Sequence, residues 1–225
     1  MNNSAPILVY TICYCVVFII TGICKKNKSN RLFDSTGLPA ANTGYLFALH
    51  LTGIFWLGLI PLILLKQSFI EVAFNSQLLS IFWLIPLLFF MLVLANTGLN
   101  ASRKIIIYHS NSPNINIRLF NAYFIIRLLF LCAYELFFRG FLLFDSIQWF
   151  GIVPAVLLST GLTVLIHVFT NKKEMLACIP FGILLCIFCI AFNAVWPAIA
   201  LHFTLSLSFE IPPARHFLNQ LKLMK

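Results

Sequence analysis

Long apolar runs alternate with short polar segments along the whole chain. A helix rises about 1.5 Å per residue, so about 20 apolar residues cross the roughly 30 Å hydrocarbon core of a bilayer. The pattern predicts seven membrane spans, at residues 5–24, 45–65, 78–99, 119–144, 153–170, 175–190 and 196–209. The last two spans are short. We therefore expect their connection, residues 191–195, to dip into the protein interior, where it is shielded from lipid.

The composition agrees with an all-α, polytopic membrane protein. Hydrophobic residues make up 61% of the 225-residue chain and charged residues 9%, against roughly 25% charged residues in soluble domains. A net charge of +9 would suit nucleic acid, but the cations sit in short clusters between apolar runs. We expect the lipid bilayer and not nucleic acid as partner. No internal repeat divides the chain, which indicates one membrane domain over residues 1–225.

The positive charges predict the orientation, because cytoplasmic loops of membrane proteins carry an excess of Lys and Arg. An outside N-terminus and a cytoplasmic C-terminus place twelve of the fifteen Lys and Arg residues on the inner side. The inner cations are residues 25, 26, 28, 31, 103, 104, 118, 172, 173, 215, 222 and 225. We expect a multi-pass protein of the cell membrane, with residues 105–108 along the interface and residues 145–151 in an external turn.

Three of the predicted spans carry pairs of polar residues four positions apart, which lie on one face of a helix. Charged residues inside a bilayer cost several kcal/mol, so by default they indicate function. Polar side chains in lipid must also face one another, which predicts that the three pairs meet. The pairs are Glu135 with Arg139, Thr163 with His167, and His202 with Ser206.

A carboxylate, two imidazoles and a hydroxyl in one dry pocket fit a hydrolytic site. Three other interpretations stay open on these residues. First, Glu135 and both histidines form a legitimate catalytic ligand set for zinc. Second, the same three residues would serve as a proton relay in a transporter. Third, the Glu135–Arg139 pair is purely structural. Two further residues carry no functional prediction: His50 is read as a packing or interfacial residue, and Arg127 as snorkelling or bonding to a neighbouring helix.

The three pairs resemble the motifs of the CPBP family of intramembrane proteases, also called the CAAX-protease and bacteriocin-processing, or Abi, family. That family shows Glu-Glu-x-x-x-Arg, then Phe-x-x-x-His, then His-x-x-x-Asn or Asp, on successive helices. The flanks Phe138-Arg139-Gly140 and Trp196-Pro197-Ala198 are similar as well, and the resemblance covers roughly residues 119–209. The first 118 residues would be additional N-terminal spans.

The resemblance implies an intramembrane endopeptidase that cleaves a membrane-associated peptide or protein without a cofactor or metal. In this scheme Glu135 is the base that activates water, and Arg139 anchors it. His167 and His202 bind the water or the oxyanion, while Ser206 orients His202. A bacterial plasma membrane is the expected location.

Three positions depart from the family pattern: Tyr134 replaces the first glutamate, Thr163 the phenylalanine and Ser206 the asparagine. The family is thought to use that first glutamate as its base. The resemblance therefore also implies an alternative, a catalytically inactive relative that acts in bacteriocin self-immunity or as a scaffold. Counted from the cytoplasmic side, Glu135 is expected deep and His167 shallow, so a meeting of the two requires helices that are offset or tilted.

Overall fold

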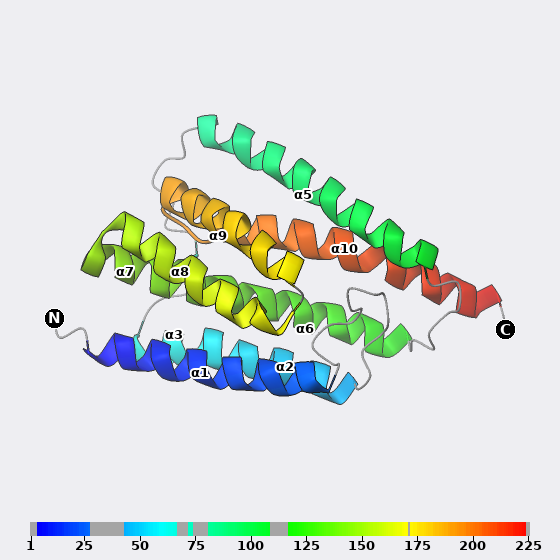
Figure 1. Cartoon of the computed structure of the whole chain (residues 1–225), viewed down its shortest axis with the longest axis horizontal. Coiled ribbons are helices and arrows are strands. Elements are labelled where there is room, and N and C mark those ends of the chain that lie inside the picture. Colours follow the sequence, from blue (N-terminus) through cyan, green and yellow to red (C-terminus); the bar gives the residue numbers. More distant parts are fainter. Residues whose placement is uncertain are drawn as a thin grey trace.

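The computed structural model describes residues 4–27, 43–66, 72–73, 81–108, 117–170 and 172–223. Within these ranges the chain is helical, has no strand and forms seven helical segments, as predicted (Figure 1). Four segments are single helices, and the three others contain π or 3₁₀ turns. The elements are α1 (Ser4–Lys26), α2 (Thr43–Gly53) with η1 (Ile54–Leu59) and α3 (Ile60–Leu64), α5 (Ile81–Tyr108), α6 (Ile117–Glu135) with η2 (Leu136–Leu142) and α7 (Leu143–Phe150), α8 (Ile152–Ile166) with η3 (His167–Phe169), α9 (Lys172–Phe192) and α10 (Trp196–Leu223).

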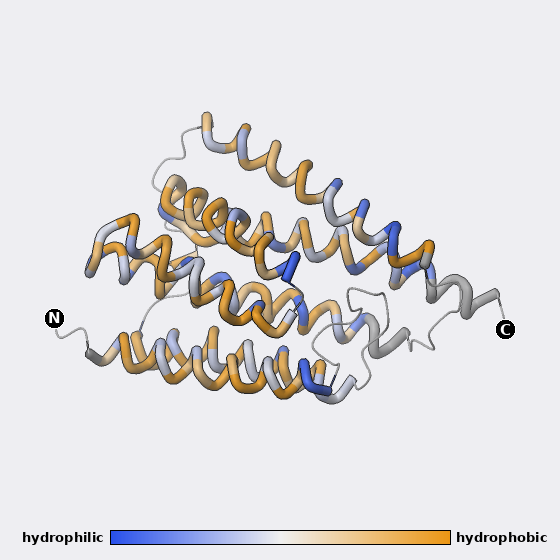
Figure 2. Tube along the Cα trace, viewed as in Figure 1, coloured by the Kyte–Doolittle hydropathy of each residue, from blue (hydrophilic) through white to orange (hydrophobic). Residues whose placement is uncertain are grey.

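Apolar side chains cover the outside of the helices. Five of the described segments are long and apolar enough to cross a membrane: Ala5–Lys26, Thr43–Leu64, Phe82–Ile107, Ile152–Phe169 and Lys172–Phe192. Large hydrophobic residues such as Phe82 and Ile107 are exposed on α5, and Figure 2 shows hydrophobic residues along most of every helix. Such an exterior is solvated by lipid tails and not by water, so the fold is that of a polytopic helical membrane protein.

Helices far apart in sequence lie side by side. In Figure 1 α5 runs along α10 on one side of the molecule, and α1 with α2–α3 forms the opposite side. The helices α6, α8 and α9 fill the space between. The start of α1 and the end of α10 lie at opposite ends of the long axis in Figure 1.

Three predicted boundaries differ from the helix bounds in the structure, and at two of them a polar residue has a partner inside the protein. The predicted external turn at 145–151 is helical up to Phe150, and only Gly151, at φ +85°, makes the turn. Asp145 stays in this helix because its carboxylate accepts a hydrogen bond from the Tyr10 hydroxyl at 2.6 Å. Residues 105–108 continue α5 without a break, and α10 runs past the predicted end at residue 209 to Leu223.

The connection between α9 and α10 lies inside the protein, as its short flanking spans predicted. Asn193 adopts a left-handed conformation at φ +48°, while Ala194 and Val195 are fully buried. The Ala194 amide donates to the Cys189 carbonyl, so this backbone is satisfied internally. A Cβ atom on Gly140 would lie 3.2 Å from the Val195 side chain. This close approach brings the start of α10 against the π turn η2.

Candidate functional site

A cavity of about 330 Å³ lies among α5, α6, α8, α9 and α10. All five residues predicted for the site line it: Glu135, Arg139, His167, His202 and Ser206. Tyr134 and Thr163 line it as well. The structure therefore brings polar side chains of three separate helices together at one cavity.

Glu135 is at the centre of the site and is fully buried. One carboxylate oxygen, Oε2, lies 3.4 Å from Nη1 of Arg139, which is equally buried. The two residues are four apart, at the start of the π turn η2. Such turns are frequent at functional sites. The guanidinium is therefore placed to hold the carboxylate of Glu135 by a charge-assisted contact.

His202 reaches the same carboxylate from α10. Its Nδ1 lies 2.5 Å from Oε1 of Glu135, and its side chain is 18% exposed, whereas that of Glu135 has no exposure. The rings of Tyr134 and Phe181 pack edge-on against the imidazole, at centroid distances of 6.0 Å and 5.5 Å. The contact to Glu135 uses Nδ1, so any chemistry of His202 toward the cavity runs through Nε2.

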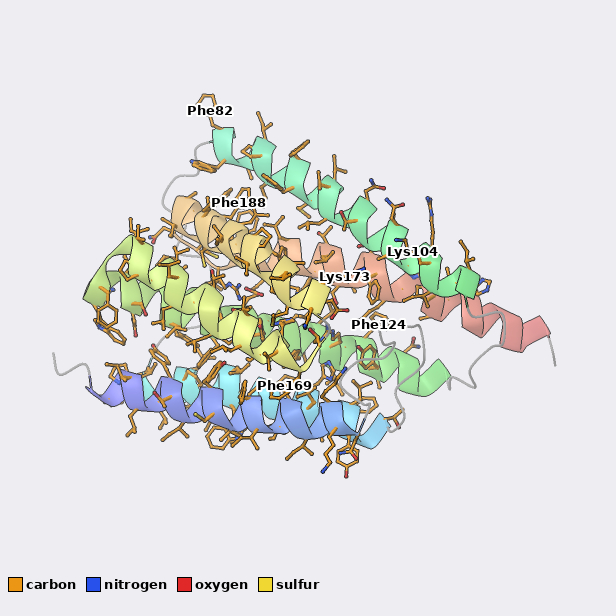
Figure 3. The ribbon with its side chains drawn as sticks, viewed as in Figure 1. Phe82, Lys104, Phe124, Phe169, Lys173 and Phe188 are labelled. Carbon is orange, nitrogen blue, oxygen red and sulfur yellow. The ribbon has the colours of Figure 1, made fainter. Side chains whose placement is uncertain are left out.

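His167 lies at the end of α8, where the helix tightens into the 3₁₀ turn η3. Its Nδ1 lies 2.9 Å from the Thr163 carbonyl. A carbonyl only accepts, so Nδ1 carries the hydrogen and Nε2 of the neutral ring is an acceptor. Phe169, two residues on and labelled in Figure 3, packs against Phe18 of α1 with tilted rings whose centroids are 4.8 Å apart, and this contact holds the turn in place.

The structure explains why Glu135 and His167 share a cavity although a count from the cytoplasmic side placed them at different depths. The helix that carries Glu135 continues to Phe150, six residues beyond the predicted end at residue 144. Counted from the turn at Gly151, Glu135 lies sixteen residues before it and His167 sixteen residues after it. The two residues are therefore level in a helical hairpin, without any offset between helices.

Ser206 has a different partner from the one the sequence predicted. Its hydroxyl donates to Oε1 of Glu210 at 3.3 Å. Glu210 is buried on the same face of α10, two turns beyond His202. The position of Ser206 in the cavity is as expected, but the interaction shown ties it to a second polar cluster and not to the imidazole.

This second cluster was missed in the sequence and joins three helices. Arg127 of α6 forms an ion pair with Glu210 of α10, with Nε 3.3 Å from Oε1. Tyr123 donates to the other oxygen of Glu210 at 2.9 Å. His50 of α2 accepts from Nη1 of Arg127 at 3.2 Å through Nε2, because its Nδ1 donates to the Leu46 carbonyl.

This cluster corrects one prediction and decides another. His50 is 1% exposed and bonded to a charged residue, so it is neither an interfacial residue nor a simple packing residue. Of the two alternatives for Arg127, bonding to a neighbouring helix is the one observed, because Glu210 of α10 holds its guanidinium inside the protein. The available signal was the spacing of His202, Ser206 and Glu210, which repeats every four residues along one face of a helix.

Metal-binding geometry is not found around these residues. Over the part of the chain that the structure describes, no group of three or more His, Cys, Asp or Glu side chains is arranged to hold a metal ion. Both imidazoles use Nδ1 for other contacts, one to a carbonyl and one to a carboxylate. Contacts of this kind fix the orientation of each ring.

Comparison with known proteins gives one match. Residues 116–208 match the family model described as Rce1-like, type II CAAX prenyl endopeptidase. The matched segment runs from the start of α6 into α10 and contains all five predicted site residues. No curated protein and no solved structure matches the chain.

Proposed function

Since the chain belongs to the Rce1-like family of CAAX-type intramembrane endopeptidases, we propose that it hydrolyses a peptide bond of a membrane-associated protein or peptide. The reaction takes place in the cavity among α5, α6, α8, α9 and α10. The observation that carries the proposal is the contact of 2.5 Å between Glu135 and His202, which lie 67 residues apart and meet at this cavity.

Glu135 and His202 act together as the acceptor of the water proton. Each oxygen of a carboxylate has two lone pairs, so the contacts to Arg139 and His202 leave acceptor capacity on Glu135. Hydrogen bonding to the carboxylate also fixes the imidazole so that Nε2 is available to the water or to the leaving amine. Arg139 holds the carboxylate in place, as the sequence predicted for it.

The remaining polar residues complete the reaction. His167 is on the same level as Glu135 and polarises the attacking water or stabilises the developing oxyanion. Ser206 lies one helical turn from His202, and we assign it to substrate contact in the cavity rather than to orienting the imidazole. The apolar wall formed by residues such as Leu185 and Phe181 excludes bulk water and strengthens these interactions.

The test is cleavage of a peptide library by the purified protein in proteoliposomes, compared with Glu135→Gln. Loss of a general base typically costs about 100-fold to 10,000-fold in rate, so we expect at least a 100-fold loss. Asp145→Asn is the matched control, because it removes one carboxylate from a helix end outside the cavity. Equal cleavage by Glu135→Gln and the unmodified protein would remove Glu135 from the mechanism.

Tyr134 favours a second candidate, a catalytically inactive scaffold of the same fold. It occupies the position of the family's first glutamate, and its ring fills space beside His202, 6.0 Å away between centroids. A scaffold would bind a membrane-associated peptide in the cavity without cleaving it. This candidate would be favoured if the unmodified protein bound peptides of the library but cleaved none of them.

A further inference from the structure

The cavity extends beyond the Glu135–His202 contact to the Arg127–Glu210 ion pair, and both pairs join the same two helices. Arg127 lies eight residues before Glu135 on α6, and Glu210 lies eight residues after His202 on α10. At about 1.5 Å per residue, the two pairs are separated by about 12 Å along either helix. They form two polar rungs between antiparallel helices, with Ser206 between them on α10.

Arg127 is the member of the second rung with donors to spare. The oxygens of Glu210 are already contacted by Ser206, Tyr123 and Arg127, and its side chain is 7% exposed. The side chain of Arg127 is 18% exposed and lines the cavity. A guanidinium has five N–H donors, and the contacts to Glu210 and His50 engage two of its nitrogens.

A peptide that enters this cavity needs such donors. An extended chain loses its hydrogen bonds to water when it enters a dry site within the membrane, and each unpaired carbonyl costs several kcal/mol. An extended chain also advances about 3.3 Å per residue. The 12 Å between the rungs therefore corresponds to between three and four residues of substrate.

We propose that Arg127 is a specificity-determining residue that binds an acceptor oxygen of the substrate, three to four residues from the bond held at Glu135 and His202. The acceptor is a backbone carbonyl or a chain-terminal carboxylate, both of which a guanidinium binds through paired N–H groups. Glu210 and His50, which contact Arg127 directly, act through it as positioning residues. This inference rests on the proposed peptide substrate, but not on its hydrolysis.

The experiment therefore measures binding in a protein that is not required to cleave. A library of fluorescent apolar ten-residue peptides, in free-carboxylate and in C-terminally amidated form, is titrated against the Glu135→Gln protein with and without Arg127→Gln. Loss of a charge-assisted hydrogen bond is expected to weaken binding roughly tenfold or more. If Arg127→Gln weakens the binding of both peptide forms, the acceptor is a backbone carbonyl. If it weakens the binding of the free-carboxylate form alone, the acceptor is the carboxylate at the chain terminus.

Two further variants separate recognition from structure. Tyr123→Phe disturbs the same cluster without removing a cavity donor, because Tyr123 is 2% exposed and does not line the cavity. It is expected to leave peptide binding within about threefold. Arg127→Lys keeps the charge but loses the planar fork, and is expected to bind with intermediate affinity.

The inference would be overturned if the protein with Arg127→Gln bound the peptides as tightly as the protein that keeps Arg127. It would also be overturned if Tyr123→Phe weakened peptide binding as much as Arg127→Gln does. Where the active protein cleaves the library, Arg127→Gln is expected to raise KM with kcat changed less than threefold. An Arg127-dependent affinity without any cleavage would keep the inference and reject the proposed hydrolysis, so the two failures are distinguishable.

Discussion

At the scale of single residues, Tyr134 is the position that tests whether the Glu135–His202 pair can act without a second carboxylate. Its ring packs against Phe138 at 4.6 Å and against His202 at 6.0 Å. Tyr134→Phe keeps this packing, so we expect peptide cleavage to change less than about threefold if the Glu135–His202 pair activates water. The measurement is initial cleavage rate in proteoliposomes.

Tyr134→Glu is the informative partner of that variant. A second carboxylate beside Glu135 in a buried site faces like-charge repulsion and loses the packing of the ring, so we expect lower thermal stability and no gain in rate. Cleavage that appears only in Tyr134→Glu would show that the natural protein is inactive, and would turn the proposal toward the scaffold.

The sequence allowed the residues of one cluster to be predicted and not those of the other. Glu135, Arg139, His167 and His202 could be found because their polar neighbours are four positions away in the same helix. The contacts of Arg127 with His50 and of Tyr123 with Glu210 cross 77 and 87 residues of sequence. No periodicity relates residues of different helices, so only the packing of α2, α6 and α10 shows these contacts.

At the scale of helices, the close contact of α5 with α10 forms one wall of the cavity and depends on Gly98. A Cβ atom at this position would lie 2.0 Å from the Ser208 hydroxyl and 3.0 Å from the Leu205 carbonyl. Gly98→Ala therefore pushes the two helices apart, and we expect a loss of about 1–3 kcal/mol of stability. Thermal unfolding in detergent measures the change.

Gly161→Ala on α8 is the matched control, because a Cβ atom there meets nothing within 4 Å. Alanine is better than glycine in a helix by up to about 1 kcal/mol, so this variant should be neutral or more stable. Equal stability of the two alanine variants would contradict the tight α5–α10 contact.

Helix ends were the least predictable feature at this scale. Hydropathy located every span, but it ended the fourth at residue 144 and the seventh at residue 209. The reason is that hydropathy counts Asp145 and Glu210 as exposed, whereas each is held inside a helix by a tyrosine hydroxyl from a distant segment. The longer fourth helix is what puts Glu135 level with His167.

At the scale of the whole molecule, the positive charges gather at one end. Lys25 and Lys26 end α1, and Figure 2 shows hydrophilic segments of α5, α9 and α10 toward the end where the C-terminus lies. Lys104 and Lys173 are labelled in this half of the molecule in Figure 3. By the positive-inside rule we expect this end, with the C-terminus, in the cytoplasm and the N-terminus outside.

Fusions test this orientation. Green fluorescent protein at the C-terminus should fluoresce, while an epitope at the N-terminus should be cleaved by protease added to intact cells, and reversed accessibility would reject the prediction.

The orientation has a consequence for the substrate. Glu210 follows His202 along α10 toward the C-terminus, so in this orientation the Arg127–Glu210 rung would lie on the cytoplasmic side of the Glu135–His202 pair. A substrate chain bound at both rungs would then reach the reacting pair from the cytoplasmic side.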